Sequence, residues 1–168
     1  RKNCFWYNEN CYRKLMMDLD KIDISKFLPH RSPFLFLDKI LILNDEEVSA
    51  SFLIKEDNLF IENNYFNEMG LVENAAQTCS SIVGKSYFDD DDTEGEGAKL
   101  IGFISAVKKI TAFSCPKVGS TIISKAKLTS RFDTDSYSVC ALECNIFEGS
   151  TLLISCEMNL IIKDLKEA

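Results

Sequence analysis

Residues Met69–Gly84 read MGLVENAAQTCSSIVG. Apolar and small side chains cover most of the circumference that this segment would have as a helix, which is typical of a buried helix. Asn67 is a favourable N-cap just before it, and Glu68 lies in the first turn, where the helix dipole stabilises a carboxylate. Yet Glu73 and Gln77 stand one turn apart on the same helix, so the segment that decides the fold also carries the candidate chemistry.

Strand-forming segments surround this helix in the sequence. The predicted strands occupy residues 34–43, 48–54, 100–110, 118–132 (with a kink), 136–147 and 152–162. Turns at 44–46 and 148–150 join two pairs of them as hairpins, residues 55–67 read as a polar loop with aromatics, and 18–27 as a short helix. The order predicts an α+β fold in which one antiparallel sheet packs against one long helix.

Length and composition favour one domain. The chain has 168 residues, of which 46% are hydrophobic and 27% charged, so residues 18–168 are expected to form a single domain. Residues 1–17 differ in pattern and read as an N-terminal extension or a remnant of cloning. Residues 89–97, DDDDTEGEG, read as a solvated loop. No apolar run approaches the roughly 20 residues of a membrane span, and no secretory signal pattern is present, so we expect a cytoplasmic protein without a membrane partner.

Charge, cysteine and histidine content exclude several classes of site. The net charge of −7 argues against nucleic-acid binding. Lysines and one arginine gathered between residues 108 and 131 are read either as a patch that docks an acidic partner or as solvated strand faces. The seven cysteines are scattered and read as reduced core thiols, and the presence of a single histidine argues against a histidine-based zinc site. We therefore expect neither a metal nor a cofactor.

Two motifs resemble one family. Leu28 to Asp38, LPHRSPFLFLD, resembles the first-strand signature of the (3R)-hydroxyacyl-acyl-carrier-protein (ACP) dehydratases, usually LPHR-x-PFLLVD, and Glu73 to Gln77, ENAAQ, resembles their EAxAQ. The resemblance, to a divergent member, implies a hotdog fold: a curled antiparallel sheet of about six strands wrapped round one central helix. It also implies a homodimer or a higher oligomer that acts on acyl chains carried on the phosphopantetheine of ACP or CoA.

The resemblance implies which residues form the site. A carboxylate at Glu73 is expected to be catalytic, facing a cavity at the dimer interface that residues 57–67 of the other chain line. The family's partner histidine, from a GHFP segment in this loop, is missing. Asn63 or Asn64 lies near its place and is expected to take a catalytic role by orienting water or the thioester carbonyl. The residues expected to bind the substrate are Gln77, Gly70, Phe66 and Ser80, where the small residues leave room for an acyl chain or for a close helix contact.

The LPHR residues have less obvious roles. His30 is expected to be structural, with a hydrogen bond that fixes the chain near Pro29, and an active-site role is the alternative. Arg31 and Asp38 are expected to be structural too, as an ion pair. Glu73 itself is read either as catalytic or as half of a structural pair with Gln77 at the dimer seam.

Three functions remain open from the sequence. The first is a dehydratase-type lyase that removes water from a 3-hydroxyacyl thioester. The second is a hotdog acyl-thioesterase, which needs one helix carboxylate and an amide or backbone donor but no loop histidine. The third is a non-catalytic acyl-ACP binder or an inactive partner of an active subunit.

Overall fold

The computed structural model describes residue 24, residues 28–85 and residues 100–164. The predicted extension at 1–17, the charged loop at 89–97 and nearly all of the predicted short helix at 18–27 lie outside these residues. Ile24 alone of that helix is described; it is helical and buried, and its carbonyl accepts a hydrogen bond from the Leu28 N–H at 2.9 Å.

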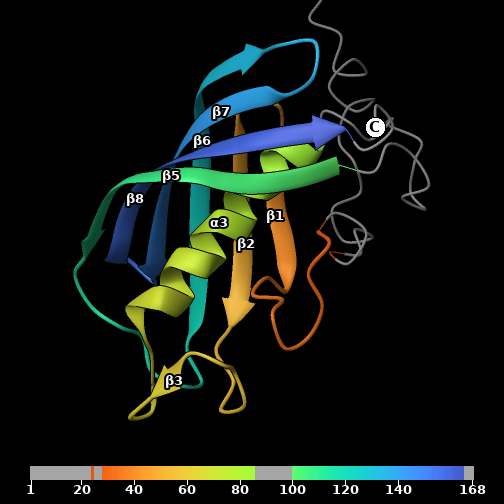
Figure 1. Cartoon of the computed structure of the whole chain (residues 1–168). Coiled ribbons are helices and arrows are strands. Elements are labelled where there is room, and N and C mark those ends of the chain that lie inside the picture. The colour runs from red at the N-terminus through yellow and green to blue at the C-terminus, as the bar shows by residue number, and fades with distance from the viewer. Residues whose placement is uncertain (1–23, 25–27, 86–99, 165–168) are drawn as a thin grey trace, which may run out of the picture.

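Six strands form one antiparallel sheet in the order β1-β2-β6-β7-β8-β5. Their bounds are β1 Lys39–Leu43, β2 Glu47–Leu53, β5 Leu100–Ala112, β6 Thr121–Asp133, β7 Ser138–Glu148 and β8 Thr151–Asp164. The sheet curls around the helix α3, Glu68–Lys85, which crosses its inner face (Figure 1). The predicted α+β arrangement and the hotdog architecture are confirmed.

The helix begins where the sequence predicts. The Asn67 side-chain oxygen accepts a hydrogen bond from the Gly70 N–H at 3.1 Å, which satisfies one of the free donors of the first turn. Most side chains of α3 are buried, while Met69 is exposed and Val72 and Glu73 are half-buried. Because the sheet curls around it, a helix that is apolar nearly all round meets apolar surface on most of its circumference.

An aromatic cluster fills the space under the first turn of α3. Phe36 lies with its ring centroid 5.8 Å from that of Phe52 and 5.9 Å from that of Phe66, and Phe60 packs beside them. Gly70 is required here, since a Cβ at this position would come within 2.5 Å of the Phe66 ring and 2.7 Å of Phe60. The helix can therefore approach these rings only through a residue without a side chain.

The first strand is shorter than predicted. Strand β1 begins at Lys39 rather than at residue 34, because the backbone of Phe34 and Phe36 is hydrogen-bonded to side chains of α3 and not to a neighbouring strand. The predicted loop at 55–67 contains a small hairpin, β3 (Ile61–Glu62) and β4 (Tyr65–Phe66), which the sequence pattern missed. The predicted kink in β6 is confirmed as a register shift between Leu128 and Ser130.

The described cysteines are core residues as predicted, except for Cys115. Those that carry a free thiol are Cys79, Cys115, Cys140, Cys144 and Cys156, and all but Cys115 are buried. Burial raises the pKa of the Cys140 thiol, and the neighbouring Cys144 thiol together with burial raises that of Cys156. Since the thiolate is the reactive form, these buried thiols are inert core residues, as predicted.

Membrane and metal features are absent from the described part of the chain. No helix among the described residues has the length and apolar character needed to cross a membrane. No group of histidine, cysteine, aspartate or glutamate side chains in the same residues is arranged to hold a metal ion.

Candidate functional site

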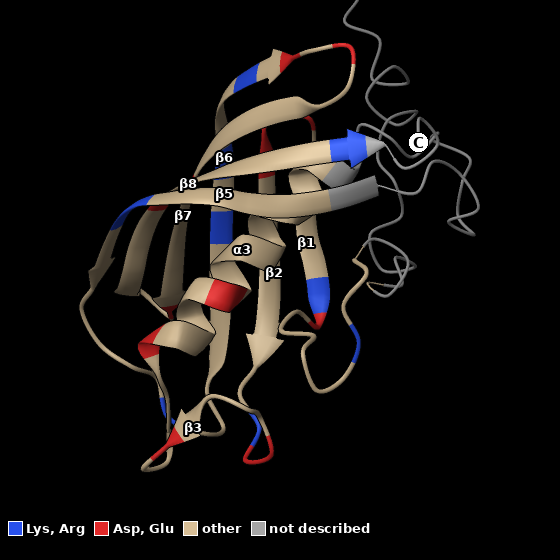
Figure 2. Ribbon diagram, in the orientation of Figure 1, with Lys and Arg blue, Asp and Glu red and all other residues tan. Residues whose placement is uncertain are grey.

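Glu73 lies in the N-terminal half of α3, where it interrupts a largely neutral helix surface (Figure 2). Its side chain is 33% exposed, so the carboxylate is not packed dry against the sheet. Its Oε1 atom accepts a hydrogen bond from the Gln77 amide at 2.8 Å, which confirms the predicted pair of residues one turn apart. Among the described residues Oε2 accepts no hydrogen bond, so one carboxylate oxygen is fixed and the other is available.

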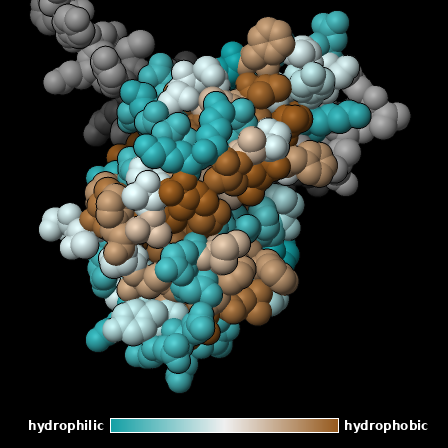
Figure 3. Space-filling view, turned by 60° about the vertical axis from the view of Figure 1, so that its left-hand side comes forward, coloured by the Kyte–Doolittle hydropathy of each residue, from teal (hydrophilic) through white to brown (hydrophobic). Residues whose placement is uncertain are grey.

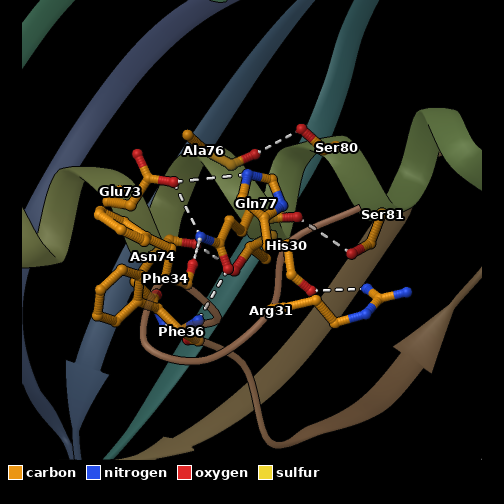
Figure 4. A network of polar contacts seen from close by, with 11 residues as sticks. His30, Arg31, Phe34, Phe36, Glu73, Asn74, Ala76, Gln77, Ser80 and Ser81 are labelled. Carbon is orange, nitrogen blue, oxygen red and sulfur yellow. Dashed lines mark hydrogen bonds and ion pairs between the residues drawn. The ribbon is translucent and has the colours of Figure 1, made fainter. Parts of the chain in front are cut away.

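Gln77 holds Glu73 and the LPHR segment together (Figure 4). Its side chain is only 1% exposed, and its amide nitrogen donates to the Phe34 carbonyl at 2.8 Å as well as to Glu73. Its Oε1 atom accepts a hydrogen bond from the Phe36 N–H at 2.9 Å. With both amide hydrogens donated to protein groups, Gln77 acts as a positioning residue, while the predicted substrate contact has no support from this geometry.

Asn74 adds a second connection that the sequence analysis missed. Its amide nitrogen donates to the Phe36 carbonyl at 2.6 Å, and its oxygen accepts a hydrogen bond from the Ser124 hydroxyl of β6. Asn74 is fully buried, and it lies three residues before Gln77, so both side chains leave α3 on the same side. Two buried amides at this spacing on an apolar helix are the signal that could have predicted the contact.

His30 lies beside the helix carboxylate. The distance from His30 Nε2 to Glu73 Oε1 is 3.8 Å, and the two side chains point toward one another in Figure 4. The His30 side chain is also 33% exposed, and its buried Nδ1 atom has no hydrogen-bond partner among the described residues. The structure therefore brings together the candidate carboxylate and the only histidine of the chain.

The turn that carries His30 is held by its neighbour. The Arg31 guanidinium donates to the carbonyls of Leu28 and His30 at 2.9 and 2.8 Å. The predicted ion pair between Arg31 and Asp38 was wrong, because an Asp38 carboxylate oxygen instead accepts a hydrogen bond from the Leu53 N–H at 2.6 Å. Arg31 therefore fixes this turn. The hydrogen bond that was predicted to give His30 a structural role is not formed among the described residues.

Asn63 and Asn64 form the turn between β3 and β4. Their φ angles are 50° and 69°, in the left-handed region that asparagine tolerates better than most residues. Both are exposed, and the Asn64 carbonyl accepts a hydrogen bond from the Val118 N–H at 3.1 Å. Within one chain the structure connects them with the loop before β6 and not with Glu73. Their role across a dimer interface stays a prediction.

The other predicted substrate-binding residues have packing roles within the chain. Phe66 is fully buried in the aromatic cluster, and Gly70 lies against it. The Ser80 hydroxyl donates to the Ala76 carbonyl of its own helix at 2.9 Å and stays half-exposed. Of this set, Ser80 alone keeps a surface that a bound molecule can reach.

A separate hollow of about 400 Å³ lies on the face of the sheet that points away from α3. It contains Lys125 and Lys127, whose clustering in the sequence raised the question of an acidic partner. Lys127 stands directly opposite Glu47 on β2 and Glu143 on β7, so its charge is offset by both neighbouring strands. This favours the reading of solvated strand faces over a basic docking patch.

Comparison with solved structures finds the same fold. A chain of the dehydratase heterocomplex ApeI:P from Xenorhabdus doucetiae is 15% identical, with a TM-score of 0.69 over 86% of this chain and 93% of that chain. The HP0420 homologue from Helicobacter felis is 11% identical, with a TM-score of 0.59 over 90% and 95% of the two chains. A hypothetical thioesterase from Streptococcus pneumoniae, solved with coenzyme A, is 8% identical, with a TM-score of 0.55 over 75% and 85%.

At these identities the solved structures are evidence of a shared hotdog fold alone. No curated protein matches the sequence. The ApeP-like family, described as ApeP dehydratase, matches residues 22–168, which include both sequence motifs and every described element. Since that match spans nearly the whole chain, the protein belongs to the ApeP-like family of hotdog-fold dehydratases.

Proposed function

We propose that this protein removes water from a 3-hydroxyacyl chain held as a pantetheine thioester, as on ACP, and yields the trans-2-enoyl product. The observation that carries the proposal is the Glu73 carboxylate: it is half-buried, has one oxygen anchored by Gln77 and the other available, and lies in a chain of a dehydratase family. A role in fatty-acid or polyene synthesis is the metabolic setting in which such a reaction is used.

The geometry of Glu73 suits proton transfer. Dehydration requires a group that takes the proton next to the thioester carbonyl and a group that protonates the departing hydroxyl. A carboxylate whose rotamer is fixed by a buried amide is held ready in one orientation, and orientation contributes much of the rate in such reactions. The proposed chemistry transfers protons and breaks the β-carbon–oxygen bond with no net oxidation or reduction, so it needs no redox group.

Hydrolysis of the thioester is the less favoured alternative. A thioesterase of the kind considered from the sequence uses a free amide or backbone donor beside the helix carboxylate. Here the Gln77 amide donates both hydrogens to protein groups, to Glu73 and to the Phe34 carbonyl, so it has none left for a substrate carbonyl. A binder without activity has no supporting feature of this kind, and it is an outcome of the experiment below.

We infer that a second hotdog chain completes the site along β5. This strand forms one edge of the sheet and exposes the apolar side chains of Phe103, Ile104, Val107 and Ile110, and Phe113, directly after its end, is exposed as well. A band of hydrophobic atoms crosses the surface in Figure 3, which brings the left-hand side of Figure 1 forward. An unpaired apolar edge favours pairing with another strand, and a second copy of β5 is the self-complementary partner. The solved ApeI:P assembly is a heterocomplex, which supports association of a chain of this fold with a further subunit, whether like or unlike.

The test is to incubate the protein with 3-hydroxyacyl-ACP and, separately, with the matching CoA thioester, and to follow both by mass spectrometry. We expect loss of one water from at least one of them. The variant Glu73→Gln keeps the side-chain shape and an oxygen that can accept the hydrogen bond from Gln77, but it cannot transfer a proton. We expect its rate of dehydration to fall by about 100-fold or more.

The matched control is Glu68→Gln, which removes an exposed carboxylate from the first turn of the same helix and should leave the rate unchanged. If the wild type releases the free acid, the activity is thioester hydrolysis and not dehydration. Unchanged substrate in both arms, from a folded protein, would reduce the chain to a binder, and a fully active Glu73→Gln variant would remove Glu73 from the site.

A further inference from the structure

The described part of the chain offers one ionisable neighbour to Glu73, and that neighbour is His30. His30 Nε2 and Glu73 Oε1 are 3.8 Å apart, which is longer than a hydrogen bond, and a small side-chain movement brings the imidazole within reach of the carboxylate. In structures without substrate such contacts are often long and shorten on binding. Both side chains are one-third exposed, so neither is sealed inside the protein.

A purely structural role does not explain His30. A histidine that anchors a turn uses its Nδ1 atom for a backbone hydrogen bond, and here that atom is buried without a partner among the described residues. Arg31 already holds the carbonyls of Leu28 and His30. The imidazole is left with Glu73 as its one polar contact in the same residues.

The position of the ring is nevertheless well determined. The segment that carries it is held against α3 by Gln77, which bonds Phe34 and Phe36, and by Asn74, which bonds Phe36 again. These buried amides therefore fix the LPHR segment to the same helix that carries Glu73. An imidazole and a carboxylate fixed on two such elements form a preorganised pair.

We propose that His30 is the second proton-transfer group of the site, and that it works with Glu73 of the same chain. The proposal rests on the dehydratase function proposed above. His30 Nε2 takes the proton from the carbon next to the thioester carbonyl, and the electron pair of that C–H bond forms the new double bond. The β-carbon–oxygen bond breaks, and Glu73 in its acid form gives its proton to the leaving oxygen, which departs as water. The enzyme ends as imidazolium and carboxylate, and transfer of one proton between them restores the starting pair.

The kinetic test compares His30→Gln, Glu73→Gln and the double variant in the dehydration assay. We expect each single variant to lose about 100-fold or more, and the double variant to be little slower than the worse single one, because groups that act as a unit are not additive. Ser32→Ala, an exposed change in the same turn, is the control and should keep the wild-type rate. If the rate loss of the double variant equals the product of the two single losses, His30 and Glu73 act independently and the proposed pair is wrong.

A second measurement separates a chemical role from a structural one. His30→Gln should unfold in urea at the wild-type concentration and should lose from its pH–rate profile the step that a titrating imidazole produces. Because the chain has one histidine, its ring signals in NMR are unambiguous, and at fixed pH they should shift in Glu73→Gln but not in Glu68→Gln. If the His30 ring signals are unchanged in Glu73→Gln, the proposed pairing of His30 with Glu73 is wrong.

The two proposals fail in different ways. If the wild type dehydrates its substrate and depends on Glu73, but His30→Gln keeps full rate, then His30 has no part and the proposed function stands. If no substrate is dehydrated while the ring signals still respond to Glu73→Gln, then the pair exists and the proposed function is wrong.

Discussion

At the residue scale, a buried amide explains how a carboxylate is kept in place on a core helix. Gln77 uses its two amide hydrogens and its oxygen on three different groups, two of them in the backbone of residues 34–36. A buried polar group without a hydrogen-bond partner costs free energy. Breaking one of these bonds therefore destabilises the fold by more than forming it stabilises the fold, because the group left behind is buried and unpaired. Glu73 thus has its orientation fixed by an interaction whose main role is to join two elements of the fold.

Replacing Gln77 by leucine, which has a similar volume, should lower the free energy of unfolding by about 2–4 kcal/mol, because the Phe34 carbonyl and the Phe36 N–H lose their partners in the interior. Urea denaturation measures the change. Ser80→Ala is the control on the same helix: the Ser80 hydroxyl only adds a bond to the Ala76 carbonyl of its own helix, and its removal should change stability by less than about 0.5 kcal/mol. Equal effects of the two changes would contradict the role assigned to Gln77.

Gly70→Ala tests the close contact at the first turn of α3. In an unhindered helix this change stabilises by about 1 kcal/mol, since alanine is the better helix former. Here the added Cβ would lie 2.5 Å from the Phe66 ring and 2.7 Å from Phe60, so we expect a loss of about 1–3 kcal/mol instead. The sign of the change in the thermal midpoint decides between the two, and a stabilised variant would mean that the rings yield easily.

At the element scale, the segment before β1 marks the limit of sequence patterns. Residues 34–43 have the composition of one strand, and half of that prediction was wrong, because composition reports burial and not which group takes up a backbone hydrogen bond. The helix, the order of the strands and the pairing of Glu73 with Gln77 follow periodicity and local spacing, and these were predicted. The approach of His30 to Glu73 depends on buried amides that join segments distant in the sequence, and no local pattern encodes it.

The hairpin of β3 and β4 tests whether its asparagines have a chemical role. Both Asn63 and Asn64 have positive φ, so Asn64→Ala should cost about 1–2 kcal/mol of strain while Asn64→Gly should be neutral or stabilising. If these residues serve only as a turn, Asn64→Gly keeps full activity. If the amide acts across a dimer interface, as the sequence predicted, the glycine variant is stable but slow. A stability curve and a rate assay on the same two variants separate the cases.

At the scale of the whole molecule, the two edges of the sheet are not equivalent. β5 exposes every side chain from residue 102 to its end at Ala112, including large apolar ones. β1, at the opposite edge, is short and has Ile40 buried within it. A long apolar edge is costly to leave in water, whereas a very short edge strand is one way in which proteins prevent unwanted pairing. The asymmetry makes β5 the edge that we expect another chain to cover.

The prediction for the assembly uses one charge on each edge. Val107→Asp places a carboxylate in the middle of β5, at a residue that is 42% exposed and pairs with Met158 of the neighbouring strand β8. Leu41→Asp makes a matching change at an equally exposed position of β1. If two copies pair along β5, a buried unpaired charge at the seam costs several kcal/mol, so Val107→Asp should sediment as a monomer at concentrations where the wild type and Leu41→Asp are dimers. Because the proposed site is completed by the second chain, the monomer should also lose dehydratase activity while its circular dichroism stays that of the folded protein.

A wild type that sediments as a monomer, but dimerises when a different hotdog chain is added, would assign β5 to an unlike partner. A Val107→Asp variant that remains a dimer would move the interface away from β5 altogether.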